Sequence, residues 1–183
     1  MLDALAAGEF DSPAGTAAAL TGAFAAGLVA ATARSLEASL AEGAAVQAKS
    51  LGQRLWALAG RSADAHRRAV DLLGRATQAS AGSRTSARDE LLAAALLAAA
   101  DVALAICEAA ADVVTLASWI AAEGPDAGRA DVVVAATIAE AAVAGAAELV
   151  SVNLAVQPTD ERTQRAHGYA QAAATSRRSL GKA

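Results

Sequence analysis

The chain has 183 residues, enough for one domain with its own hydrophobic core and no need of disulfides or metal ions. Its formal net charge is −4 and its pI about 5.1, with dispersed basic residues, so nucleic acid is not an expected partner. The single cysteine, Cys107, excludes an intramolecular disulfide and a cysteine-cluster metal site, which fits a reducing cytoplasm.

The composition is strongly biased towards helix. Hydrophobic residues make up 55% of the chain and aromatic residues only 3%, and roughly a third of all residues are alanine. Alanine lets helix axes approach closely, but each buried alanine contributes little apolar area. We therefore expect long helices, and oligomerisation as a second source of buried area.

Three prolines and the clustered glycines and serines divide the chain into segments. They predict a short helix at residues 2–7, a second helix that starts near residue 15 and runs past residue 33, and further helices at 44–79, 86–122, 130–152 and 159–179. Residues 39–43 favour a bend in the second helix, and residues 60–62 favour a break within the third. No strand-like alternation and no internal repeat is found. The prediction is a single all-α domain over residues 1–183, an alanine-rich up-and-down bundle of about five to six helices, with homodimers expected.

Residues 16–33 form an uncharged stretch about as long as a membrane-spanning helix requires. Only four of them are strongly apolar, no aromatic belt is present, and the later apolar stretches carry several acids. The first charged residues of the chain are acidic, unlike those of an export signal. We expect neither membrane insertion nor secretion.

Three motifs occur in an order and spacing that resemble those of the cyclodeaminase/cyclohydrolase family. Residues 12–20, after a short helix, resemble the Pro-Gly-Gly-Gly-Ser loop and alanine-rich helix of that family. Residues 130–136 resemble its Ser-Asp-Ala-Gly segment, and residues 150–154 resemble its Asn-Val-x-Ile-Asn-Leu ending. The resemblance extends over nearly the whole chain.

This resemblance implies a helical homodimer that acts on a tetrahydrofolate derivative, with no tightly bound cofactor. The reaction would be either opening of methenyltetrahydrofolate or release of ammonia from formiminotetrahydrofolate, and both need a proton moved at a bridging C–N bond. A non-catalytic or repurposed homodimer that binds another small molecule or a protein is the alternative.

The chain departs from the family pattern at several polar positions. The glycine loop is reduced to Pro13-Ala14-Gly15-Thr16, and residues 35–39 contain no cation in place of the family's Lys-Lys-Tyr segment. Leu149 and Ser151 occupy positions that are Asn and basic in the family. These departures favour the alternative function.

Four residues are the candidate site. Gly15 and Thr16 open a helix whose N–H groups could bind a carboxylate, although Thr16 could equally be a simple N-cap. Asp131 is the candidate general acid/base, or else a first-turn acid that favours the helix dipole. Asn153 is a candidate substrate ligand or a helix-end cap.

Asp131 and Asn153 share one face of the 130–152 helix with residues 138, 142, 145 and 149. They lie about 33 Å apart along its axis, too far to share a pocket within one chain. An antiparallel two-fold pairing of this helix would bring Asp131 of one chain towards Asn153 of the other.

The other polar residues predict no further site. Asp101, Glu108 and Asp112 form a stripe opposite the predicted core stripe and are expected to be solvated, unless a partner covers them and raises their pKa values. Asp64 is expected on the surface. The two histidines, His66 and His167, have no partner at zinc-ligand spacing, so no metal is predicted.

Overall fold

A computed structural model describes residues 13–34, 36, 38–78, 86–125, 128–157 and 159–180. These residues form five helices and no strand. The helices are α2 (Pro13–Ala33), α3 (Ala38–Gln78), α4 (Ser86–Glu123), α5 (Arg129–Asn153) and α6 (Glu161–Leu180).

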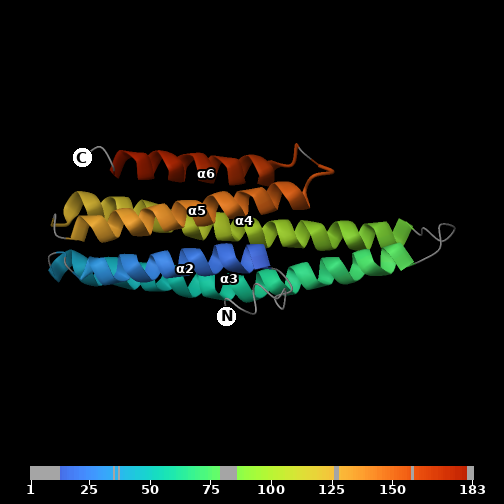
Figure 1. The fold of residues 1–183 in the computed structure, drawn as a ribbon, viewed down its shortest axis with the longest axis horizontal. Coiled ribbons are helices and arrows are strands. Elements are labelled where there is room, and N and C mark those ends of the chain that lie inside the picture. Colours follow the sequence, from blue (N-terminus) through green and yellow to red (C-terminus); the bar gives the residue numbers. More distant parts are fainter. Residues whose placement is uncertain are drawn as a thin grey trace.

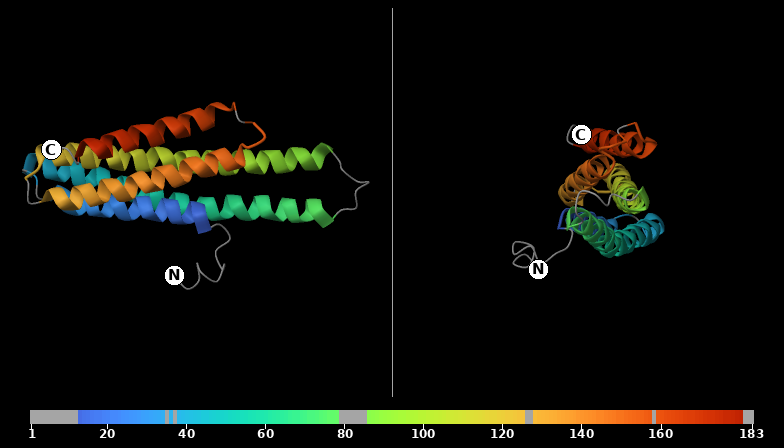
Figure 2. Two further views of the ribbon diagram at one scale, coloured as in Figure 1. Left: turned by 45° about the horizontal axis from the view of Figure 1, so that its top comes forward. Right: turned by 90° about the vertical axis from the view of Figure 1, so that its right-hand side faces the viewer.

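Four helices form an up-and-down bundle and the fifth lies on its outside. Each of α2 to α5 packs against the next in the chain, and α5 also packs against α2, which closes the bundle. The helix α6 packs on α4 and α5, so the outer side of α2 and α3 has no covering helix among the described residues (Figure 1). The far halves of α3 and α4 extend beyond the other helices as a two-helix arm (Figure 2).

The core of the bundle is made mainly of alanine, with leucine and valine next and no buried aromatic side chain among the described residues. Leu55, Ile106 and Ile120 are its largest fully buried residues. Small side chains allow the helix axes to approach closely, and long helices supply the contact area that each alanine lacks. Gly22 is one point of close approach, because a Cβ atom there would lie 3.2 Å from the side chain of Leu55.

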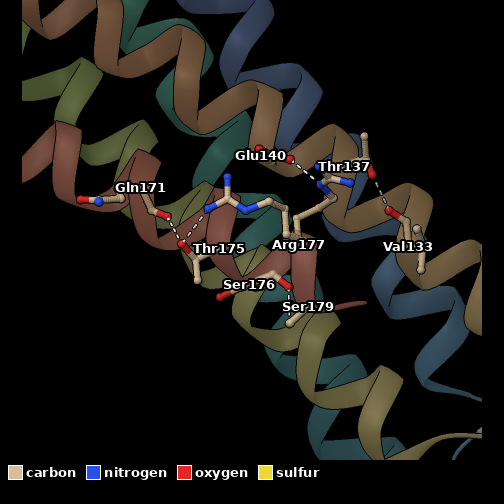
Figure 3. Close-up of polar contacts among 9 residues, drawn as sticks. Val133, Thr137, Glu140, Gln171, Thr175, Ser176, Arg177 and Ser179 are labelled. Atoms are coloured by element: carbon tan, nitrogen blue, oxygen red, sulfur yellow. Dashed lines mark hydrogen bonds and ion pairs between the residues drawn. The ribbon is translucent and has the colours of Figure 1, made fainter. Parts of the chain in front are cut away.

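The helix α6 is attached by a few small buried side chains and by ion pairs. Its buried residues are Ala166, Ala173 and Leu180. Arg177 Nε donates to Glu140 Oε2 of α5 at 2.9 Å (Figure 3). Nearer its start, Arg162 Nε lies 2.7 Å from Asp101 Oδ1 of α4. The docking of α6 is therefore more polar than the packing inside the bundle.

The all-helical class and the up-and-down arrangement are confirmed for the described residues. The predicted bend at 39–43 and the break at 60–62 are wrong, because α3 begins at Ala38 and continues through Gly60 without interruption. Packing of α3 against both α2 and α4 outweighs the local helix-breaking tendency of glycine. The predicted helix at 2–7 lies outside the described residues.

Three helical stretches are long and apolar enough to cross a membrane, judged by length and composition alone. They are Ala14–Ala33, Arg88–Glu123 and Arg129–Asn153. Only 39–44% of the most apolar window of each is buried inside the bundle. The outside of the bundle therefore keeps much apolar surface, and the expectation that the chain stays out of a membrane remains a prediction.

Candidate functional site

Thr16 lies inside the first turns of α2, which begins at Pro13, and not at the helix start that the sequence predicts. Its side chain is only 7% exposed, and its hydroxyl donates to the carbonyl oxygen of Ala59 in α3 at 3.3 Å. Neither the N-cap nor a free helix start is found at Thr16. The hydroxyl instead links the first turns of α2 to the middle of α3.

Gly15 lets the start of α2 approach two other helices. A Cβ atom at this position would collide with the Ser62 hydroxyl of α3 and would lie 3.5 Å from the Leu149 side chain of α5. Any larger residue would push these helices apart. The glycine is therefore explained by packing, whether or not a ligand also approaches it.

Asn153 lies at the same end of the bundle as Gly15 and Thr16. It is the last residue of α5, one turn beyond Leu149, and it is half-buried. Its Nδ2 donates to the Leu149 carbonyl oxygen at 2.8 Å, which leaves its Oδ1 as the atom able to accept from a ligand. Three of the four predicted site residues thus come together at one end of the bundle.

Asp131 is exposed in the first turn of α5, at the opposite end of the bundle from Asn153. The helix is continuous between them, so their separation along its axis is about 33 Å. Nearby, the Arg129 guanidinium donates to the carbonyl oxygens of Ala121 and Leu180, each at 3.3 Å. These bonds hold the start of α5, which carries Asp131, against the ends of α4 and α6.

The face of α5 that is open to a partner differs from the predicted one. Ala142, expected on that face, is 1% exposed and faces the core. The exposed side of α5 instead carries Val134, Thr137, Ala141, Ala144, Gly145, Glu148 and Val152. Gly145 has open space above it, and Glu148 is the only charged residue of this set.

A groove of about 640 Å³ runs between α2 and α3 on the side of the bundle away from α6. Its floor is made of alanine and glycine residues, which include Gly27 and Gly52. Two aromatic side chains border it, with Phe24 63% and Trp56 69% exposed. Thr16 lies one turn before Leu20, the first α2 residue of the lining, so the groove begins beside the Thr16–Ala59 hydrogen bond.

Two cations, Arg34 and Lys49, line this groove, and no acid is found among its described lining residues. Neither cation falls within residues 35–39, where the family pattern places its basic residues, and Lys49 reaches the groove only through the antiparallel pairing of α3 with α2. One feature of the sequence does indicate that Lys49 faces α2. Lys49 shares one helix face with Ala45, Gly52 and Trp56, opposite a helix that contains no charged residue.

The acidic stripe on α4 is only partly as predicted. Asp101 and Glu108 are exposed enough to be solvated, but each is in an ion pair, Asp101 with Arg162 of α6 and Glu108 with Arg54 of α3, both at 2.7 Å. Asp112 makes no hydrogen bond or ion pair with another described residue, and partial burial together with Glu108 raises its pKa, against a smaller opposing effect of Arg54.

The remaining predictions concern isolated residues. Asp64 is exposed as expected and pairs with Arg67 on its own helix at 3.0 Å. His167 Nε2 lies 3.3 Å from the Ser151 hydroxyl, and His66 is exposed. Among the residues that the structure places, no three His, Cys, Asp or Glu side chains are grouped so as to hold a metal ion.

The comparisons with known proteins agree with these observations. A search of curated proteins gives no match. In a search of solved structures, the chain is similar to the formiminotetrahydrofolate cyclodeaminase of Thermotoga maritima, with a TM-score of 0.68 and 18% identity over 91% of this chain and 88% of that one. The sequence model of the formiminotransferase-cyclodeaminase family matches residues 1–172. Because this match covers nearly all of the 183 residues, the chain belongs to the formiminotransferase-cyclodeaminase family.

Proposed function

We propose that the protein binds a tetrahydrofolate derivative in the groove between α2 and α3 and acts on it as a methenyltetrahydrofolate cyclohydrolase or a formiminotetrahydrofolate cyclodeaminase. The observation that carries the proposal is the groove itself, whose described lining residues include two exposed aromatic side chains and two cations and no acid. Membership of the family and the name of the similar structure support the same ligand class.

The groove fits the chemistry of a folate along its length. A tetrahydrofolate derivative has a fused ring system, a benzoyl ring and a glutamate with two carboxylates. Trp56 and Phe24 offer apolar and aromatic surface to the rings, while Lys49 and Arg34 offer positive charge to the carboxylates. In this orientation the fused rings lie towards Thr16 and Gly15, which are predicted to bind substrate.

The general acid/base in this proposal is Asp131, and it must come from a second copy of the chain. Within one chain Asp131 is at the far end of α5 from Gly15, Thr16 and Asn153. A two-fold antiparallel pairing of α5 centred near residue 142 brings Asp131 of one chain to the same level along the axis as Asn153 of the other. In such a pair the two copies of Glu148 are about 18 Å apart along the axis, so they do not repel each other strongly.

The exposed side of α5 is suited to this pairing. Val134 and Val152 are 50% and 69% exposed, and small residues between them allow close approach. Placing a large side chain at Gly145, where nothing lies within 4 Å, would block a partner without disturbing the chain's own packing. We therefore expect light scattering to give twice the chain mass of 18.0 kDa without detergent, and Gly145→Trp to give the chain mass. A wild-type monomer would contradict the dimer.

The direct test of activity is spectroscopic. Purified protein is mixed with methenyltetrahydrofolate, and the loss of its ultraviolet absorbance is followed; ammonia release is measured separately with formiminotetrahydrofolate. Asp131→Asn should lose most of any acceleration, by about 10²–10⁴-fold, because it removes the proton-transfer group. Asp71→Asn, an exposed acid on the arm, is the charge-matched control and should keep the activity. No acceleration with either substrate, together with no heat of binding, would contradict the folate proposal.

The second candidate function is binding without turnover. It is favoured by the two hydrogen bonds that already engage the Thr16 hydroxyl and the Asn153 amide group within the chain. Binding of methenyltetrahydrofolate in calorimetry, weakened by Lys49→Ala but without any loss of absorbance, would favour this function over catalysis.

A further inference from the structure

A second cleft, of about 510 Å³, lies between the first turns of α3 and the last turns of α4. It is separate from the α2–α3 groove and has no lining residue in common with it. Leu40, Leu116 and Trp119 supply its apolar surface, and Gln47 and Asp112 supply polar groups. The activity proposed above makes no use of this cleft.

Asp112 is the one charged residue among the described residues that line this cleft. The other two acids on the same side of α4 are neutralised, Asp101 by Arg162 and Glu108 by Arg54. Asp112 has no such partner within the described residues, and its partial burial disfavours the ionised form. A positive group in the cleft would therefore meet a carboxylate that is not yet paired.

The apolar side chains of the cleft follow the Asp112 carboxylate along the same face of α4. Trp119 follows Asp112 by seven residues on the same face of α4, about 10 Å along the axis, with Leu116 between them. The indole is 38% exposed, and Leu40 of α3 faces the cleft beside it. Thr115 also lines the cleft, but its hydroxyl donates to the Ala111 carbonyl oxygen at 3.1 Å.

We propose that this cleft binds a small organic ammonium ion with an apolar body about one aromatic ring in size. The ammonium group pairs with the Asp112 carboxylate and donates to the Gln47 side-chain oxygen, while the apolar body lies on Leu116 and the Trp119 indole. The α2–α3 groove has the opposite charge, with two cations and no acid among the lining residues that the structure describes. The two sites therefore select ligands of opposite sign, and this proposal does not depend on the folate proposal.

The test uses the fluorescence of Trp119. The chain has two tryptophans, so Trp56→Phe isolates the signal of the cleft. 2-Phenylethylammonium is titrated into the full-length variant, with 2-phenylethanol and phenylacetate as neutral and anionic probes of the same shape. We expect a saturable change with the ammonium ion in the millimolar range and binding of the other two probes at least about tenfold weaker.

Two further variants distinguish binding in the cleft from a general effect of the protein's net charge. Adding Asp112→Asn to the Trp56→Phe chain should weaken binding at least about tenfold, because the ammonium ion loses its counter-charge. Adding Asp71→Asn, which makes the same change in net charge far away on the arm, should leave binding unchanged. The proposal is overturned if no saturable change occurs, if the alcohol binds as well as the ammonium ion, or if the two variants weaken binding equally.

Discussion

The hydroxyl of Thr16 donates a hydrogen bond to the carbonyl oxygen of Ala59, 3.3 Å away and 43 residues later in the chain. Thr16 and Thr32 are the buried polar residues among those that the structure describes, and Thr32 bonds within its own helix, to the Leu28 carbonyl oxygen. The Thr16 bond joins two helices, at the point where the α2–α3 groove begins.

Replacing Thr16 by Val should lower the free energy of unfolding by about 0.5–1.5 kcal/mol, because the side chain keeps its shape and loses the inter-helix hydrogen bond. Urea denaturation measures this difference. The control is Thr137→Val on the exposed side of α5, where the hydroxyl bonds to Val133 of the same helix (Figure 3). Equal losses in the two variants would show that the inter-helix bond contributes nothing.

Gly22 is a core position where added volume should be poorly tolerated. A Cβ atom there would lie 3.2 Å and 3.3 Å from the two methyl groups of Leu55 and 3.5 Å from Ala110. Gly22→Val should destabilise the protein by about 1–3 kcal/mol through overpacking. Gly60→Ala, in α3 with nothing within 4 Å, should instead stabilise it by about 0.5–1 kcal/mol. Thermal unfolding of both variants checks the contrast, and a stable Gly22→Val would contradict the packing.

Asp112→Asn should stabilise the protein at neutral pH. Burial raises the folded-state pKa of Asp112, so ionisation costs more in the folded than in the unfolded chain. The cost is present above the folded pKa, declines as the pH falls through that pKa, and is absent below the unfolded value of about 3.8. Because the side chain is largely exposed, we expect a gain of about 0.5 kcal/mol or less at pH 7.

Urea unfolding of wild type and Asp112→Asn at several pH values measures this difference. The difference in unfolding free energy between the two proteins should shrink as the pH is lowered towards the pKa of Asp112 in the unfolded chain. A variant that is less stable than wild type at neutral pH would show that the carboxylate is stabilised in the folded chain, contrary to the direction of its pKa shift.

Cys107 should be unreactive in the folded protein. Its side chain is fully buried, its Sγ donates to the Val143 carbonyl oxygen at 3.6 Å, and burial raises its pKa to about 12. Almost no thiolate is therefore present at pH 8, and thiolate is the reactive form. An aromatic disulfide reagent should label Cys107 only as fast as the chain opens, with rapid labelling in urea as the control. Rapid labelling without denaturant would contradict the burial.

The sequence predicts the ends of the helices well where prolines mark them. Pro13, Pro125 and Pro158 stand at or beside helix boundaries, and the helix that begins at residue 86 was predicted to within a residue at its end. The prediction failed in α3, where Gly43 and Gly60 are tolerated because tertiary packing on both sides compensates for their low helix propensity.

The candidate site was predictable only in part. Gly15, Thr16 and Asn153 were named from motifs, and the antiparallel order of the helices explains why they come together. The cations Arg34 and Lys49 were not found, because their proximity depends on how α2 and α3 align. The unpaired state of Asp112 depends on Arg54 and Arg162 reaching its neighbours, which no spacing rule describes.

The attachment of α6 divides the molecule into two parts that respond differently to ionic strength. The four-helix bundle is held mainly by apolar contacts, which dilute salt hardly affects, although the exposed pair Arg54–Glu108 also joins α3 to α4. By contrast, α6 depends in part on the pairs Arg177–Glu140 and Arg162–Asp101 at its two ends. Screening of ion pairs therefore lowers the free energy needed to open α6 more than that needed to open the bundle. The backbone amides of α6 therefore exchange with solvent sooner as salt is added, while those around Ile106 and Val143 keep their protection.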